Sequence, residues 1–277
     1  MLVPVCSADP PDASGQVVPG VASSPLVSLL RAPVRRARVV AATSRLVAIV
    51  VEAAAPQVVC VTAGAGGALP CALTVDGSVP YAEVGTVVAV GSGRVQLPGA
   101  VVTTIRWRPV RPPVLTDPGS CFARAAGCPT PDLPPALVEY ADELAMVLAG
   151  GAVSPTALAA PVQALLGFGP GLTPAGDDVL TAALVALHAA GDAATSSLAA
   201  AIAAGRPFER TTALSAGLLH LAQTGLAVRQ LTRFVEALGT PGADLTASGQ
   251  ALLRVGHTSG AAMYLGAVAA LRRRRPV

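Results

Sequence analysis

The residues best suited to chemistry lie in a glycine-rich stretch, residues 167–178 (GFGPGLTPAGDD), which leads into an apolar helical pattern. Thr173 is a natural helix cap and Pro174 suits the first helical position, so we expect the helix to begin there. The first backbone N–H groups of a helix lack helical partners, and the helix dipole is positive at that end. Glycines also let a ligand approach the main chain closely. The stretch therefore predicts a small-anion site, with these candidate ligands: Gly169, Gly171, Leu172 and Thr173.

Two adjacent carboxylates, Asp177 and Asp178, follow this loop. They are candidate catalytic residues and candidate ligands of a Mg²⁺ ion that bridges to a phosphate or carboxylate. Neighbouring residues on a helix diverge by about 100°, so both can bind one ion only if the helix start is distorted. The structural alternative is that they stabilise the helix N-terminus and cap nearby amides.

Two further segments place hydroxyl groups at predicted helix starts, residues 210–215 (RTTALS) and 256–260 (GHTSG). If the helices bring these starts together, the cluster could bind a small polyanion, and Arg206 or Arg210 could add a bidentate charge. For any one loop alone, helix capping is the competing explanation. The candidate anion-binding residues here are Arg210, Thr211, Thr212, Ser215, Gly256, Thr258, Ser259 and Gly260.

His257 is the histidine best placed for proton transfer, because it lies in a polar turn beside Thr258 and Ser259. His188 and His220 lie within Ala/Leu-rich helical patterns and are interpreted as structural residues. No GxSxG motif is present, so the sequence predicts no hydrolase triad of that type.

All 19 basic side chains are arginine, and lysine is absent. This excludes a Schiff-base lysine, a P-loop lysine and a protein-kinase lysine. The glycine loop is not a GxGxxG fingerprint either, since position 172 is Leu, so no nucleotide cofactor motif is present.

The net charge is +3, but the arginines at 272–275 contribute four positive charges, so the rest of the chain carries 3 − 4 = −1. We therefore expect no nucleic-acid partner and interpret the arginine run as a solvated helix end. The five cysteines (Cys6, Cys60, Cys71, Cys121 and Cys128) form no CxxC pair, and the N-terminus has no basic signal-peptide region. Residues 179–190, the longest uncharged apolar helical run, are too few to span a bilayer. These features predict a cytoplasmic protein with reduced thiols and no membrane segment.

Short β-branched segments in the first half of the chain and helical apolar patterns in the second half predict an α+β protein. We expect a mobile leader over 1–25, a β module over 26–109, a Pro-rich linker over 110–134 and a helical domain over 135–277. The β module should form a small antiparallel sheet or barrel. Its predicted strands are 38–43, 45–52, 57–64, 69–76, 85–90 and 101–107.

Local signals mark several boundaries within these parts. Asp76-Gly77 is a hairpin signal. Ser154-Pro155 should start a helix, which Pro161 should kink or split. Leu231, Phe234, Val235 and Leu238 form one apolar helical face, and the second half as a whole predicts about eight helices.

The three motifs GFGPGLTPAGDD, RTTALSAGLL and GHTSG, in this order, resemble the family that includes the third, AllH-like subunit of bacterial oxamate carbamoyltransferase. The resemblance covers about residues 135–271 and involves the candidate residues of all three motifs. It implies a role in purine-ureide (allantoin) catabolism, in which oxalurate and phosphate exchange with oxamate and carbamoyl phosphate. It also implies partner subunits, including one similar to acyl-CoA synthetases. Family members often carry an acidic residue soon after the TSG, where this chain has Ala261 and Ala262.

The leading hypothesis is a carbamoyltransferase component that acts on small anions. Asp177 and Asp178 would bind Mg²⁺ or orient substrate, and His257 would carry a proton. One alternative is a non-catalytic anion-binding or scaffold subunit of a multisubunit enzyme, favoured by the absence of a recognisable nucleophile. A second is a stand-alone metal-dependent hydrolase that uses the aspartates and His257.

Overall fold

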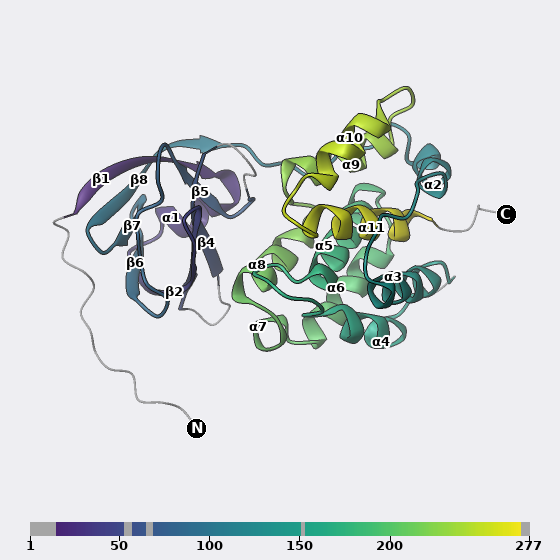
Figure 1. Ribbon diagram of the computed structural model, residues 1–277, viewed down its shortest axis with the longest axis horizontal. Helices are drawn as coiled ribbons and strands as arrows, with labels where there is room; N and C mark the ends of the chain where they lie inside the picture. Colours follow the sequence, from purple (N-terminus) through teal and green to yellow (C-terminus); the bar gives the residue numbers. More distant parts are fainter. Residues whose placement is uncertain (1–14, 53–56, 65–68, 151–152, 273–277) are drawn as a thin grey trace. The chain divides into compact units, whose positions relative to one another are not determined.

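The computed structural model describes residues 15–52, 57–64, 69–150 and 153–272. The chain divides into two compact units, Met1–Pro109 and Val110–Val277. The first is a β unit and the second is helical (Figure 1). The α+β class expected from the sequence is confirmed. Cys6 and the arginines at 273–275 lie outside the described residues.

The β unit is a closed eight-stranded barrel. Its strands are β1 (Gln16–Ser23), β2 (Arg35–Ala42), β3 (Leu46–Val51), β4 (Gln57–Ala63), β5 (Ala72–Val75), β6 (Val87–Gly91), β7 (Arg94–Leu97) and β8 (Ala100–Arg108). They follow the order β1-β5-β4-β3-β2-β6-β7-β8, and β8 closes the barrel against β1. A 3-10 turn (Ser24–Leu26) and the short helix α1 (Val27–Arg31) follow β1.

The barrel departs from a purely antiparallel arrangement at two strand pairs. Both β1–β8 and β4–β5 are parallel, whereas the other neighbours are antiparallel. The predicted hairpin at Asp76-Gly77 is wrong, because β5 pairs with β1 and β4 and not with the next strand, β6. The turn at 91–93 does join a hairpin, between β6 and the unpredicted strand β7.

The leader expected over 1–25 is too long, because residues 16–23 form strand β1. Pro19 and Gly20 weaken the strand signal in this segment. The barrel explains Gly20, since a Cβ atom there would lie 2.8 Å from the Leu73 side chain. Parallel pairing with β8 orders the segment and leaves neither of these strands at an open edge.

The helical unit contains ten helices in its described part, where the sequence predicted about eight. They are α2 (Pro118–Ala126), α3 (Pro135–Leu148), α4 (Pro155–Leu165), α5 (Ala175–Ala189), α6 (Ala194–Ala204), α7 (Pro207–Arg210), α8 (Ala213–Ala222), α9 (Arg229–Leu238), α10 (Leu245–Leu253) and α11 (Ser259–Leu271).

The helix boundaries in this unit agree in part with those predicted from the sequence. Ser154 caps α4 by accepting a hydrogen bond from the Ala157 N–H, but α4 continues through Pro161 and is not split there. The predicted apolar face of α9 is buried. The predicted linker 110–134 contains helix α2, which the side chain of Asp117 caps through the Ser120 N–H. The many prolines hid this short helix, although Pro at a first helical position is favourable.

Helix α5 forms the centre of the helical unit. Every residue from Ala175 to Leu187 is buried, as expected for a helix that is apolar on all sides. Helix α11 packs mainly against α5, and the two lie side by side in Figure 1. A Cβ atom at Gly266 of α11 would lie 2.2 Å from the Val179 carbonyl oxygen of α5, so glycine is required for this close approach.

Among the described residues, no helix is long and apolar enough to cross a membrane. The four described cysteines are buried and form no disulfide. The thiols of Cys60, in β4, and Cys71, immediately before β5, lie 3.8 Å apart, and both side chains are buried in the barrel. Arg272, the first residue of the arginine run, donates a hydrogen bond to the Cys128 carbonyl oxygen at 2.7 Å.

Replacing Gly266 with Ala is expected to lower the free energy of unfolding by about 1–3 kcal/mol, because the added methyl group forces α5 and α11 apart. Urea denaturation monitored by circular dichroism measures this change. Gly127→Ala is the matched control, since a Cβ atom there would meet its nearest neighbour at an ordinary 3.6 Å. Equal stability of the two variants would contradict the close packing of α5 and α11.

Candidate functional site

Hydrogen bonds join the three sequence motifs into one cluster in the helical unit. The Thr212 hydroxyl, at the start of α8, donates to the Leu172 carbonyl oxygen at 2.6 Å. The hydroxyls of Thr173 and Ser259, the latter at the start of α11, lie 3.0 Å apart. The glycine loop thus contacts the N-terminal ends of two other helices. We call these residues, together with Asp177 and Asp178, the loop cluster.

Asp177 is the most highly bonded side chain of the cluster. It is 0% exposed, and its Oδ1 accepts a hydrogen bond from the Gly167 N–H at 2.8 Å. Its Oδ2 accepts hydrogen bonds from the hydroxyls of Thr211 and Ser215. Burial raises the pKa of Asp177, and these three donors oppose the rise because they favour the ionised form. Asp177 therefore ties the glycine loop to the start of α8, and most of its acceptor capacity is used within the protein.

Asp178 lies beside Asp177 but is bonded differently. Its side chain is 6% exposed, and its Oδ2 is buried without a hydrogen-bond partner in the described structure. Burial raises the pKa of Asp178 to about 8. The Ser259 hydroxyl opposes this rise, and the neighbouring charge of Asp177 adds to it. A buried carboxyl oxygen without a partner is unusual in a native protein, which makes Asp178 a candidate contact for a ligand.

The start of α5 differs by one residue from the sequence-based expectation. The helix begins at Ala175 with Pro174 as its cap, and the Pro174 carbonyl oxygen accepts from the N–H groups of Asp177 and Asp178. Thr173 therefore does not cap the helix. Its hydroxyl is directed to Ser259 instead. The extended conformation of Pro174, with ψ near 140°, explains why the helix starts after it.

Two structural features favour glycine in this loop: positive φ angles and close approach to other main-chain atoms. Gly167 has φ +79°, and a Cβ atom there would lie 2.6 Å from the Arg210 carbonyl oxygen. Gly169 and Gly171 also have positive φ values of +101°. The space where a Cβ atom of Gly171 would lie is open, so this position leaves the main chain accessible. Leu172 is exposed at the same part of the loop.

The structure does not bring every predicted residue into the cluster. Gly256, His257 and Thr258 are exposed in the turn before α11. Gly260 has a packing role, because a Cβ atom there would lie 2.1 Å from the Leu252 carbonyl oxygen. Thr212 caps α8 by accepting from the Ser215 N–H at 3.1 Å, so the capping alternative holds at this position.

The arginines proposed as anion ligands are engaged elsewhere. Arg206 forms an ion pair with Glu209 at 2.9 Å, and the exposed Arg210 donates to the Gln163 carbonyl oxygen at 3.2 Å. Within the described residues, no three His, Cys, Asp or Glu side chains form a group that could hold a metal ion. A cation at Asp178 would therefore need substrate or water oxygens for most of its ligands.

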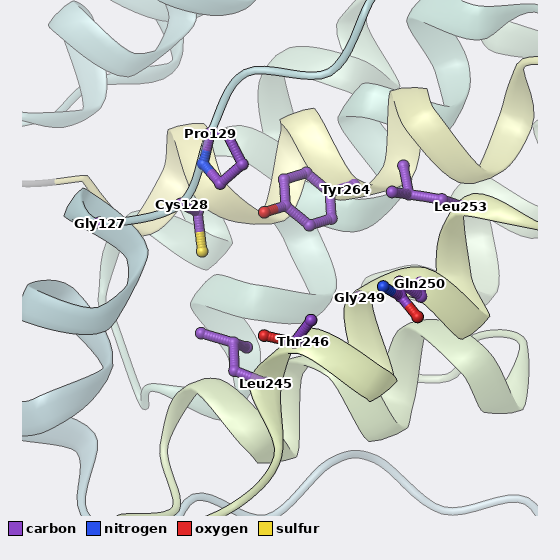
Figure 2. Close-up of a pocket in the computed structure, with 9 residues that line it drawn as sticks. All are labelled: Gly127, Cys128, Pro129, Leu245, Thr246, Gly249, Gln250, Leu253 and Tyr264. Carbon is purple, nitrogen blue, oxygen red and sulfur yellow. The ribbon is translucent and has the colours of Figure 1, made fainter.

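The helical unit also has a pocket of about 240 Å³ that the sequence did not predict (Figure 2). Tyr264 of α11 and Cys128 lie on one side of it, and Thr246, Gly249 and Gln250 of α10 lie on the other. Burial raises the pKa of Tyr264, and the neighbouring thiol of Cys128 raises it further. The pocket forms where α10, α11 and the end of α2 meet, and no local sequence signal marks such a meeting point.

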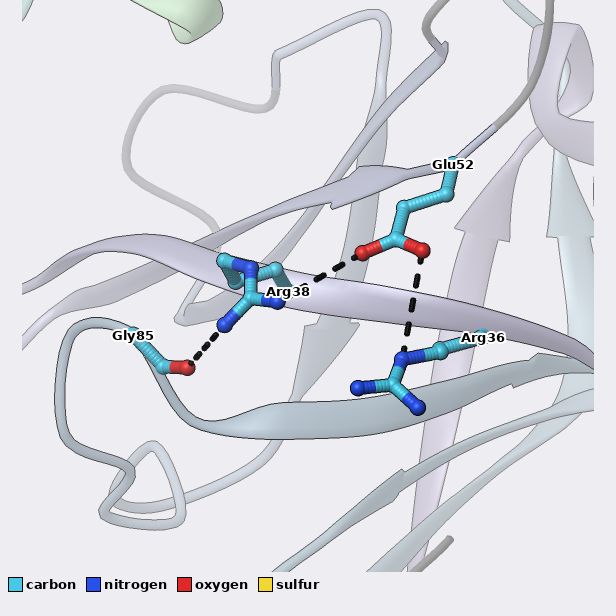
Figure 3. Close-up of polar contacts among 4 residues, drawn as sticks. All are labelled: Arg36, Arg38, Glu52 and Gly85. Atoms are coloured by element: carbon cyan, nitrogen blue, oxygen red, sulfur yellow. Dashed lines mark hydrogen bonds and ion pairs between the residues drawn. The ribbon is translucent and has the colours of Figure 1, made fainter. Parts of the chain in front are cut away.

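In the β unit, two arginines of β2 share one carboxylate (Figure 3). Arg36 Nε and Arg38 Nη2 lie 3.9 and 3.7 Å from the carboxylate oxygens of Glu52, and Arg38 also donates to the Gly85 carbonyl oxygen at 2.9 Å. These ion pairs are partly exposed, so they contribute little to stability, about 0–1 kcal/mol each.

Taken together, the fold and the loop cluster define a β-barrel protein with a helical unit in which three helix starts surround a buried carboxyl pair. The family model of the oxamate carbamoyltransferase subunit AllH matches residues 165–271. The resemblance inferred from the three motifs is thus confirmed over this segment, which contains the whole loop cluster. No solved structure matches the chain.

Asp177→Ala is expected to destabilise the protein by at least about 2 kcal/mol, because it leaves one buried N–H and two hydroxyls without their acceptor. Thermal unfolding followed by circular dichroism measures this loss. Asp142→Ala, on the exposed face of α3, is the control and should leave the melting temperature nearly unchanged. A wild-type melting temperature for Asp177→Ala would show that these hydrogen bonds do not hold the cluster.

Asp178→Asn should change how stability depends on pH. The unfolded chain releases the Asp178 proton near its ordinary pKa of 3.8, whereas the folded protein retains it up to about pH 8. The folded state therefore binds more protons in this window, and stability falls as pH rises through it. Asn removes this contribution. The melting temperature of the variant minus that of wild type should therefore be larger at about pH 8 than at about pH 4. An identical difference at both pH values would mean that Asp178 ionises normally.

Proposed function

We propose that this chain is a subunit of an oxamate carbamoyltransferase-like enzyme that acts on small anions in purine-ureide catabolism. The observation that supports this most directly is the AllH family match, whose range of 165–271 coincides with the joined helix starts. The proposed substrates are oxalurate and phosphate in one direction and oxamate and carbamoyl phosphate in the other. Because AllH is a subunit of that enzyme, we further propose that this chain works with partner chains, in a cytoplasmic complex.

The proposed reaction breaks the bond between the carbamoyl carbon and the oxamate nitrogen and forms a bond from that carbon to a phosphate oxygen. A proton must reach the departing nitrogen. Helix N-termini suit this chemistry because both substrates are anions that accept hydrogen bonds from free N–H groups and hydroxyls. In this proposal the loop residues Gly169 to Thr173, with Ser259, hold the carboxylate or phosphate.

The two aspartates have separate roles in the proposal. Asp177 is a positioning residue, because its carboxylate is bonded to the loop and to α8. Asp178 contacts the substrate, either directly or through Mg²⁺ as one ligand of the ion. His257 is the proposed proton carrier, since it lies in the exposed turn two residues before Ser259.

A non-catalytic anion-binding or scaffold subunit is the second candidate. It is favoured by the internal bonding of the cluster, in which Asp177, Thr211, Thr212 and Ser215 already satisfy one another or the backbone. A stand-alone metal-dependent hydrolase is the third candidate, and it requires Asp178 and His257 to act on water without phosphate.

Carbamoyl phosphate formation from oxalurate and phosphate tests these candidates, first with the purified chain alone and then with its partner subunits. We expect phosphate-dependent turnover in the complex and a loss of at least about tenfold in Asp178→Ala, whereas Asp142→Ala should keep wild-type activity. Chelation by EDTA tests the Mg²⁺ proposal in the same assay.

The possible outcomes separate the candidates. Turnover by the complex that is insensitive to Asp178→Ala, with no turnover by the chain alone, would support the scaffold. Oxalurate breakdown by the chain alone that needs a metal but not phosphate would support the hydrolase. No phosphate-dependent turnover under any condition would reject the carbamoyltransferase.

A further inference from the structure

Asp178 has a bonding requirement that the protein alone does not meet. Its side chain is more than nine-tenths buried, and Oδ2 has no hydrogen-bond partner in the described structure. Leaving a buried carboxyl oxygen unpaired costs free energy, and buried polar atoms in native proteins are nearly always paired with protein, water or ligand. A ligand group that donates a hydrogen bond would satisfy this atom.

The neighbouring carboxylate of Asp177 does not compete with Asp178 for a hydrogen-bond donor of the ligand. The carboxylate of Asp177 already accepts from Gly167, Thr211 and Ser215. The Ser259 hydroxyl pairs with the Thr173 hydroxyl and also hydrogen-bonds to the Asp178 carboxyl, and Asp178 Oδ2 is still left without a partner. The cluster therefore leaves Asp178 Oδ2 as one buried carboxyl oxygen without a partner, and a ligand N–H that donates to it favours the ionised form of Asp178.

We propose that Asp178 is a specificity-determining residue that accepts a hydrogen bond from an N–H group of the ligand. The ligand class is a small carboxylate or phosphate that carries a primary amide or carbamoyl group within the same molecule. The anionic end binds the loop and the Thr173–Ser259 hydroxyl pair, and the NH₂ group binds Asp178 Oδ2. This inference rests on the proposed function. It gives the Asp178 carboxyl group a role in a site that binds anions, as the acceptor for the N–H group of the ligand.

The geometry makes a prediction about ligand choice. An analogue in which a methyl group replaces the NH₂ group fills the same space but leaves Asp178 Oδ2 unpaired, so it should bind more weakly. Pyruvate is such an analogue of oxamate, and acetyl phosphate is such an analogue of carbamoyl phosphate. Hydrogen bonds to charged or strongly polar groups contribute enough for a preference of about 10- to 100-fold.

Isothermal titration of the full chain, with its partner subunits if the complex is required, compares oxamate with pyruvate. We expect wild type to prefer oxamate by about 10- to 100-fold, and Asp178→Ala to bring the ratio of the two dissociation constants close to one. Asp178→Asn keeps a carbonyl oxygen and should retain part of the preference. Asp142→Ala is the control and should retain all of it.

Several results would overturn this inference. Equal binding of oxamate and pyruvate by wild type would do so without any variant, which keeps the test valid even if Asp178→Ala fails to fold. An oxamate preference that persists in folded Asp178→Ala would also do so, and in both cases the carbamoyltransferase proposal stands. If wild type in the complex binds none of oxamate, pyruvate and phosphate, the proposed function and this inference fall together.

Discussion

The carboxylate of Asp177 is the interaction on which the loop cluster depends. It lies in the first turn of α5, and its three donors come from the glycine loop and from the start of α8. Without this carboxylate the Gly167 N–H and two hydroxyls would be buried or half-buried without an acceptor, at a cost of about 1–3 kcal/mol for each group. The charge is stabilised at the same time by the positive end of the α5 dipole. One side chain thus determines where the glycine loop lies relative to two helices.

The position of α5 depends in turn on its packing in the helical unit. The helix is buried along its length, and α11 approaches it closely because position 266 is glycine. This approach places the N-terminal end of α11, with Ser259, against Thr173 of the glycine loop. The hydroxyl pair is therefore a consequence of helix packing, and the chemistry of the cluster cannot be separated from the core that supports it.

The charge composition of the chain shapes the site. The chain has no lysine, and the two arginines nearest the motifs interact with Glu209 and with the Gln163 backbone. In the described structure the loop cluster therefore consists of hydroxyls, backbone N–H groups and two carboxyl groups. Such a set can bind an anion through hydrogen bonds alone, and it leaves Asp178 able to distinguish ligands by their own donors.

The sequence by itself determined the features that depend on a few neighbouring residues. These include the α+β class, the cap at Ser154, the apolar face of α9 and the three motifs that resemble the AllH family. Caps and apolar periodicity are local, because each involves residues within about two helical turns. The glycine loop was also visible in sequence, since its composition alone signals a special backbone.

Only the tertiary structure decided the features that depend on distant partners. Strand β1 forms because β8 pairs with it in parallel, and the Thr173 hydroxyl finds its partner in Ser259, which is distant in the sequence. The contrast between the two aspartates is of the same kind. They are neighbours in sequence and the same residue type, but Asp177 meets three donors while Asp178 Oδ2 meets none, because adjacent helical positions point in directions about 100° apart.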